Sequence, residues 1–169
     1  MLEKEPESFL TQIGEYTYLQ SDNGELFFTK DRVYKKYQCD HENDDGVLEK
    51  VSALKAYELS KRYSLEIHVI ADEYVITSTP RYKCSLLDHI LSIDKTKRKD
   101  EFAKYFSKIN FLINDLRKNN LYHADLALRN ICMDEENNLY LIDFEELSLG
   151  KKKKNCYMFK MINDIEQYC

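Results

Sequence analysis

The sequence has no tryptophan, only two prolines and only four glycines among its 169 residues. Disordered and low-complexity chains are usually rich in proline or glycine, so this scarcity argues against both classes. Charged residues make up 33% and hydrophobic residues 43%. A chain of this length and composition buries an ordinary core without disulfides or a structural metal. We therefore expect one folded domain over residues 1–169.

The five cysteines are an odd number, and no two of them form a C-x-x-C pair. This favours reduced thiols over a disulfide framework or a zinc site. The first ten residues are acidic and lack the apolar segment of a Sec signal peptide, and no apolar run approaches the length of a membrane span. These features predict a cytoplasmic protein with no membrane partner. Delivery into a host cell by another secretion route would leave no such mark.

The net charge is −5 and the pI is near 5.5, so no general attraction to nucleic acid is expected. Basic residues nevertheless cluster at 95–99 and at Lys151–Lys154. The second cluster is either a solvated loop or a surface that attracts an acidic protein or a phosphorylated sugar.

Alternating apolar residues and turn signals predict strands in the first half of the chain. A helix is predicted between two groups of strands, over residues 47–62, because its apolar residues recur at helical spacing. The strands are predicted at 16–19, 25–29, 33–37, 65–70 and 74–77. The first three form a three-stranded antiparallel sheet, and the last two form a further hairpin.

The pattern becomes helical after Pro80, with a short helix near 86–91 and a longer one that opens at Asp100 and ends at Asn119–Asn120. The apolar face of the longer helix is predicted to contain Phe102, Tyr105, Phe106, Ile109, Leu112, Ile113 and Leu116. A hairpin over 131–142 and a closing helix over 158–168 follow. The predicted class is α+β, with a strand-rich part at about 12–79 and a helical part at 80–169.

Three polar side chains carry the candidate chemistry. Asp125 and Asn130 are five residues apart after the long helix, and Asp143 lies thirteen residues beyond Asn130. The intervening hairpin would return Asp143 to the side of Asn130, which would give two oxygen ligands to a hard cation such as Mg²⁺. Asp125 would lie beside them and accept a proton from a hydroxyl, as phosphoryl transfer requires.

The segment His123-Ala124-Asp125-Leu-Ala-Leu-Arg-Asn130 resembles the protein-kinase catalytic loop H-R-D-L-x-x-x-N, and Asp143-Phe144-Glu145 resembles D-F-G. Both intervals also match. The resemblance implies a kinase-like fold with a small N-terminal lobe, the cofactors ATP and Mg²⁺, a structural role for His123, and metal binding by Asn130 and Asp143.

The same template implies further residues in the first half. Lys35 would hold the ATP phosphates, Val33 would line the adenine pocket on the same face, and Lys36 would point outward; alternatively, both lysines are surface residues. Glu49 is the expected partner of Lys35, although another alignment places Lys50 there. Gly24 would allow the tight turn that covers the phosphates.

Several positions depart from the kinase pattern. Ala124 replaces an arginine, Glu145 replaces the glycine of D-F-G, and Ala127 replaces a lysine, while Arg129 gives the A-x-R-N order of many tyrosine kinases. No A-P-E motif follows, so we expect a truncated helical lobe. Asp164 is either the aspartate that anchors the catalytic loop in kinase folds or a solvated residue.

Two families share such truncation. Type III secreted effector kinases of the OspG/NleH type resemble the chain from about Tyr16 to Cys169, which implies a protein substrate and docking to ubiquitin or a ubiquitin-conjugating enzyme. Lipopolysaccharide-core sugar kinases are the second comparison. We expect an ATP- and Mg²⁺-dependent protein kinase that acts as an effector; the alternatives are a small-molecule kinase and a pseudokinase-like binding module.

Overall fold

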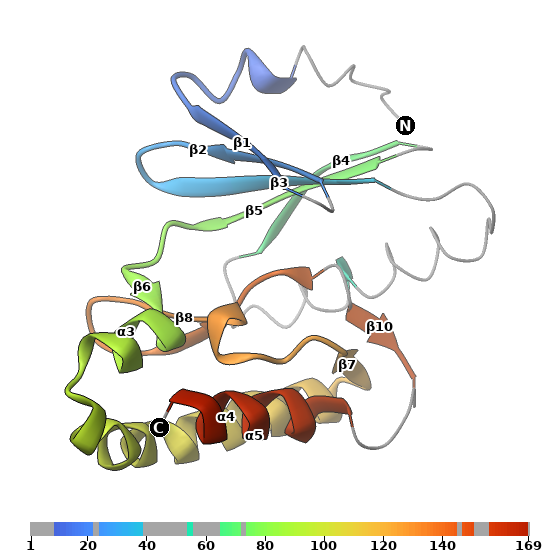
Figure 1. Ribbon diagram of the computed structural model, residues 1–169. Coiled ribbons are helices and arrows are strands. Elements are labelled where there is room, and N and C mark those ends of the chain that lie inside the picture. Colours follow the sequence, from blue (N-terminus) through green and yellow to red (C-terminus); the bar gives the residue numbers. More distant parts are fainter. Residues whose placement is uncertain are drawn as a thin grey trace. The chain divides into compact units, whose positions relative to one another are not determined.

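The computed structural model describes residues 9–21, 24–38, 54–55, 65–71, 74–144, 147–150 and 156–168, with the side chains of 38, 156–160 and 162 left aside. Internal contacts divide the chain into two compact units, Met1–Arg81 and Tyr82–Cys169. The architecture is α+β, with an N-terminal antiparallel sheet and a long helix in the second unit (Figure 1). Within the described ranges, no helix combines the length and apolar character that crossing a membrane requires.

The first unit is built on one five-stranded antiparallel sheet of order β1-β2-β3-β5-β4 (Figure 1). The strands are β1 (Thr17–Ser21), β2 (Gly24–Phe28), β3 (Arg32–Gln38), β4 (Glu66–Ile70) and β5 (Tyr74–Pro80). All five predicted strands are confirmed to within a few residues. The predicted three-stranded sheet and the later hairpin are joined in one sheet, because β5 pairs with β3 over its full length. Of the predicted helix over 47–62, only Leu54 and Lys55 are described, and both are helical.

One face of this sheet carries a compact apolar cluster of Phe9, Val69 and Ile76. The helical turn at Phe9 lies over the sheet, and the Phe9 ring contacts Tyr34 at 5.8 Å and His68 at 5.2 Å between ring centres. Because the segment before β1 supplies an apolar ring that two strands need, it belongs to the core of the unit.

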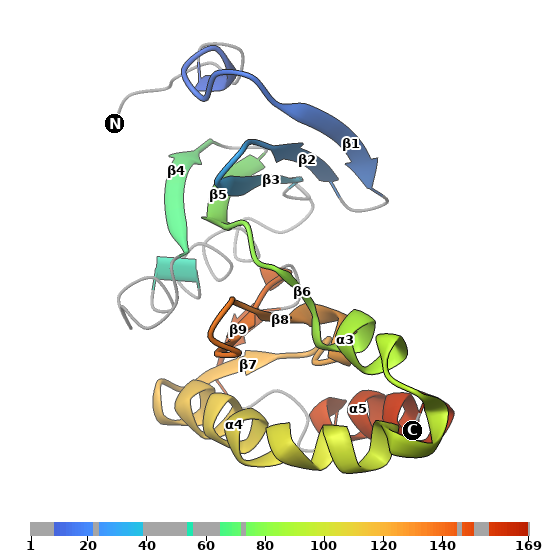
Figure 2. The same ribbon diagram turned by 90° about the vertical axis from the view of Figure 1, so that its left-hand side faces the viewer.

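The second unit contains a 21-residue helix, a 13-residue helix and several short strands (Figure 2). The elements are β6 (Cys84–Ser85), α3 (Leu86–Ser92), η1 (Lys95–Lys97), α4 (Arg98–Lys118), β7 (Leu121–His123), η2 (Leu128–Asn130), β8 (Ile131–Met133), β9 (Leu139–Leu141), β10 (Leu147–Leu149) and α5 (Cys156–Tyr168). Strands β6, β8 and β9 form one antiparallel sheet, and β7 pairs with β10. The predicted hairpin and closing helix are both confirmed.

The long helix α4 begins two residues before the predicted Asp100 and ends at Asn119, as predicted. Its buried face contains Phe102, Tyr105, Ile109, Leu112 and Leu116. The assignment of Phe106 to this face is wrong, because the residue is 58% exposed. At 100° per residue, Phe106 lies at the margin of the apolar stripe, and neighbouring elements do not extend that far.

The side chain of Arg98, at the start of α4, bonds to backbone carbonyls at the ends of two other helices. Its guanidinium donates from Nε to the Ile93 carbonyl at 3.0 Å, from Nη2 to the Leu91 carbonyl at 3.1 Å, and from Nη1 to the Tyr168 carbonyl at 3.1 Å. These acceptors lie at the C-terminal ends of α3 and α5, where helices leave carbonyls without intrahelical partners. Arg98 therefore ties the start of α4 to the ends of α3 and α5, and Figure 2 shows the chain end beside this start.

Arg98→Ala should lower the free energy of unfolding by about 2 kcal/mol, because hydrogen bonds to a charged donor are worth roughly 1.5–3 kcal/mol before the discount for partial exposure. The matched control is Lys99→Ala, which removes a charge from an exposed neighbour. Urea unfolding of both variants measures the difference. Equal stability of the two would contradict the role given to Arg98.

Glu101 makes a pH-dependent contribution to the stability of the fold. Hydrogen bonds from Lys104 and then His89 to its carboxylate lower its pKa below the usual 4.5. Since a lowered folded-state pKa stabilises the fold above the unfolded pKa, this contribution is lost as the pH falls through the folded value. Glu101→Gln should therefore cost more stability at about pH 6 than at about pH 3. Thermal unfolding across this range tests it, with Glu166→Gln as the exposed control.

Candidate functional site

Asp125 and Asn130 are brought into direct contact by the loop that follows β7. The Asn130 amide nitrogen Nδ2 donates to the Asp125 backbone carbonyl at 2.9 Å and to its carboxylate oxygen Oδ2 at 3.1 Å. The turn η2 makes this possible, because its tight winding returns residue 130 toward residue 125. Asn130 is only 5% exposed, so its amide is held in one orientation.

Asp143 is placed beside this loop through its neighbour Ile142. The Ile142 N–H donates to the Asn130 carbonyl at 3.0 Å, and the Ile142 carbonyl accepts from His123 Nε2 at 3.0 Å. Asp143 itself adopts a left-handed backbone conformation with φ of 60°. Such a conformation is uncommon outside glycine and is concentrated at functional sites, where surrounding contacts hold it.

His123 and Phe144 supply the packing under this arrangement. His123 is fully buried, and Phe144 is 1% exposed, with the two ring centres 6.2 Å apart in an edge-on arrangement. Strand β10 pairs with β7 and places Leu147 opposite His123. A donor at Nε2 requires the proton on that nitrogen. His123 is therefore fixed as a buried structural residue, in agreement with the role implied by the sequence.

Helix α5 anchors the loop from the other side. The Asp164 carboxylate oxygen Oδ2 accepts from the Leu128 backbone N–H at 2.9 Å. Leu128 is the first residue of η2, so its N–H is one of those that a helical turn leaves without a backbone acceptor. Of the two predicted roles for Asp164, the structure supports anchoring rather than simple solvation.

Arg129 forms an ion pair with Asp125 that the sequence alone did not predict. The Arg129 Nη2 donates to Asp125 Oδ2 at 2.7 Å, the same oxygen that accepts from Asn130. The arginine is half-exposed, whereas the aspartate is largely covered. The spacing of four residues between opposite charges was the available signal. Two donors on one oxygen orient the Asp125 carboxylate.

The oxygen-rich character of this site suits a hard cation. The described residues contain no group of three or more His, Cys, Asp and Glu side chains close enough to bind a metal. A site made of one amide oxygen and one carboxylate differs from that pattern, and it is the sparse kind that Mg²⁺ accepts, since Mg²⁺ keeps several waters and takes further oxygens from substrate phosphates. The Asn130 amide commits its nitrogen to Asp125, so Oδ1 is the amide atom that could hold a metal.

The two described cysteines of this unit, Cys84 and Cys132, are unsuited to nucleophilic chemistry. Burial raises the pKa of Cys132 to about 12, and burial also raises the pKa of Cys84 on the neighbouring strand. Both thiols are therefore protonated near neutral pH and lack the thiolate that nucleophilic catalysis needs.

Two lysines of β3 lie on opposite faces of the sheet, as strand alternation requires. Lys36 Nζ forms an ion pair with Glu25 Oε1 at 2.6 Å and lies 5.2 Å from the centre of the Tyr74 ring. Lys36 points to the face opposite Lys35, as predicted, and its side chain is only 17% exposed there. Lys35 Nζ lies 4.8 Å from the centre of the Tyr37 ring, and Lys35 shares its face with Val33. The two lysines therefore have different surroundings on the two faces of the sheet.

Gly24 opens β2 with φ of 148°. A β-carbon at this position would lie 2.2 Å from the carbonyl oxygen of Lys36 on β3, which is far closer than van der Waals contact allows. The glycine is therefore required by the close approach of β2 and β3. This packing explains the residue whether or not a phosphate approaches the turn.

Other predicted residues lie outside the described ranges. Glu49 and Lys50, Glu145, and the basic cluster Lys151–Lys154 belong to this group. Their predicted roles stay predictions.

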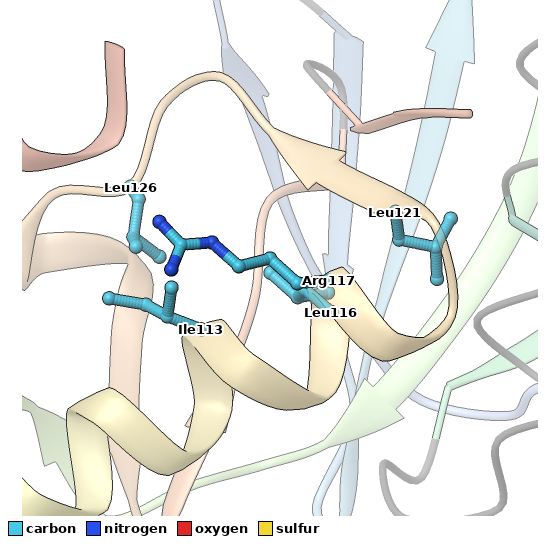
Figure 3. A pocket seen from close by; sticks show the side chains of 5 residues that line it. All are labelled: Ile113, Leu116, Arg117, Leu121 and Leu126. Carbon is cyan, nitrogen blue, oxygen red and sulfur yellow. The ribbon is translucent and has the colours of Figure 1, made fainter. Parts of the chain in front are cut away.

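A small apolar cavity lies beside the C-terminal half of α4, where Figure 3 shows the Arg117 side chain extending toward Leu126. Its lining residues are Ile113, Leu116, Arg117, Leu121 and Leu126. The cavity measures about 10 Å³, which is close to the minimum for one water molecule. It is a packing defect behind the loop, and it offers no room for a nucleotide.

Comparison with models of known protein families gives no match, and no curated protein is significantly similar to this sequence.

Asp164→Ala should accelerate hydrogen exchange of the Leu128 amide by roughly 10- to 100-fold, since a hydrogen bond to a charged acceptor is worth roughly 1.5–3 kcal/mol. Asp164→Asn should show a smaller increase, because its amide oxygen can still accept the bond. The exposed neighbour provides the control Asn163→Ala. NMR exchange measurements on the three variants and the wild type test the anchor; unchanged exchange in Asp164→Ala would rule it out.

Proposed function

We propose that this protein is an ATP- and Mg²⁺-dependent phosphotransferase with a reduced protein-kinase-like fold, which transfers the γ-phosphate to a protein hydroxyl. The observation that carries the proposal is the fixed geometry of Asp125, Asn130 and Asp143. Asn130 contacts Asp125 directly, and Asn130 also accepts the backbone bond that holds the residue before Asp143. Phosphoryl transfer depends mainly on positioning and charge stabilisation, so such a rigid constellation suits it.

Asp125 is the group that orients the acceptor. Its carboxylate accepts the hydroxyl proton as the acceptor oxygen bonds to the γ-phosphorus and the bond from that phosphorus to the bridging oxygen breaks. The two bonds to Oδ2, from Arg129 and Asn130, fix the plane of the carboxylate. Arg129, half-exposed beside Asp125, adds positive charge where the transferred group is negative.

Mg²⁺ is the metal that this donor set suits, with Asn130 Oδ1 and the Asp143 carboxylate as its protein ligands. When bound, it neutralises phosphate charge. The bonds through Ile142 and the left-handed conformation of Asp143 hold the backbone of Asp143 at the loop, so the backbone that carries this carboxylate is fixed before any metal binds.

The resemblance of the sequence to protein kinases is the support for the remaining nucleotide contacts. It assigns Lys35 to the α- and β-phosphates and Val33, on the same face of β3, to the adenine site. It also assigns Gly24 to the turn that covers the phosphates, and it assigns Glu49, which lies outside the described residues, as the partner of Lys35.

A protein acceptor, an effector role and docking to ubiquitin or a ubiquitin-conjugating enzyme follow from the resemblance to the secreted effector kinases. A sugar acceptor and a purely binding function are the competing outcomes of the experiment below.

Asp125→Ala should lower the rate of phosphate transfer from ATP by roughly 10²–10⁴-fold, because a positioned base typically contributes that much. Asp143→Asn should lower both transfer and Mg²⁺-dependent nucleotide binding. The wild type and both variants are incubated with labelled ATP, Mg²⁺ and either protein mixtures or glycan extracts. Label in protein supports the proposal, and label in glycan alone shifts the acceptor to a sugar.

The matched control is Asp134→Ala, which removes a carboxylate from the β8–β9 turn of the same unit. It should reduce stability and leave transfer intact under folded conditions. Stabilisation of the wild type by Mg·ATP without any transfer would show a binding module and reject the enzyme.

A further inference from the structure

The two edges of the sheet in the first unit differ in their protection. Edge strands present unpaired backbone groups, and proteins block them with charges, bulges or short length. Strand β4 has two of these devices: it contains Glu66, and its register with β5 shifts between Ile67 and Val69. Strand β1 has neither, since its sequence Thr-Tyr-Leu-Gln-Ser is uncharged and its pairing with β2 runs without a shift.

Most side chains of β1 are exposed, and two neighbouring aromatic rings are already restricted. Tyr18 is 48% exposed and Leu19 is 52% exposed, on opposite faces of the sheet. The rings of Tyr16 and Tyr18 lie 5.3 Å and 5.5 Å from the ring centre of buried Phe27. Because Phe27 already restricts these two rings, little conformational entropy remains to be lost when a partner covers them.

We propose that β1 pairs with β1 of a second copy of this chain, antiparallel, about a two-fold axis at Leu19. Rotation about this axis places Leu19 opposite Leu19, Tyr18 opposite Gln20 and Thr17 opposite Ser21. Each pair matches apolar with apolar or hydroxyl with polar, and no charge lies opposite a like charge. The five-stranded sheets of two copies then continue as one sheet.

A second copy suits this edge because the strand is self-complementary. The Tyr18 hydroxyl donates to Gln20 Oε1 within the strand, and the antiparallel register brings the same two residue types together across the axis. A two-fold interface uses one patch on both partners, so each favourable pair occurs twice. The proposal stands on the first unit alone and does not depend on phosphotransferase activity.

The proposed dimer is weak because its interface is small. Stable interfaces bury about 1,200–2,000 Å², and two strands of five residues bury less. Self-association is therefore concentration-dependent, with a dissociation constant in the micromolar range.

Sedimentation of the full chain from about 5 to 500 µM measures the association. The wild type should rise from 20.2 kDa toward twice that mass. Leu19→Lys places two ammonium groups opposite each other and should weaken association at least 10-fold. The matched control is Ile70→Lys, which makes the same kind of change at an exposed apolar residue of β4, 41% exposed, and should leave association unchanged.

A cysteine variant tests the proposed register between the two β1 strands directly. Directly opposed residues of an antiparallel pair have Cα atoms about 4.5–5.5 Å apart, which falls within the range of a disulfide. Leu19→Cys should therefore form a covalent dimer under mild oxidation faster than Ile70→Cys or the wild type, whose own cysteines set the background. A wild type that stays monomeric over the whole range, or equal weakening by both lysine variants, would overturn the proposal.

Discussion

The backbone of Ile142 makes two hydrogen bonds on which the candidate site depends. Its N–H donates to the Asn130 carbonyl, and its own carbonyl accepts from His123. One residue thereby joins the end of β9, the last residue of η2 and the end of β7, although these segments are separated along the chain. Asp143 follows immediately, so its backbone has little freedom, and burial of Phe144 on the next position removes most of what remains. A left-handed conformation of Asp143 is tolerated because these contacts over-determine it.

Much of this could be predicted from sequence because it depends on local periodicity. The strands near 16–37 and 65–80, the long helix that ends at Asn119 and the hairpin after Asn130 all follow from alternation, helical spacing or turn residues. The proximity of Asn130 to Asp143 also followed, since a hairpin of known length returns the chain to its start. Periodicity does not show how far neighbouring elements extend over a helix face. The prediction for Phe106 failed for that reason, and the residue is exposed. Periodicity also cannot give pairing between distant strands, such as β3 with β5.

The electrostatic contacts were harder still to predict. Lys35 and Lys36 are adjacent and chemically alike, and only the register of β2 against β3, which sets Glu25 opposite Lys36, separates their roles. Arg129 was identified as a nearby cation, but its ion pair with Asp125 depends on the winding of η2. Gly24 was assigned to a phosphate-covering turn, whereas the close carbonyl of Lys36 gives an independent reason for glycine there. A residue can thus match a functional motif even though strand packing alone is enough to require that residue type.

The anchor between Asp164 and Leu128 has a consequence for biosynthesis. These residues are 36 positions apart in the chain, and synthesis proceeds at roughly 5–20 residues per second. The loop around Asp125 therefore leaves the ribosome about 2 to 7 seconds before the helix that fastens it. During that interval β7 and η2 lack the acceptor for the Leu128 N–H as well as the carbonyl that Arg98 binds at Tyr168. The candidate site is therefore completed only when α5 docks, and a nascent chain that contains the motif residues alone does not yet hold them in this geometry.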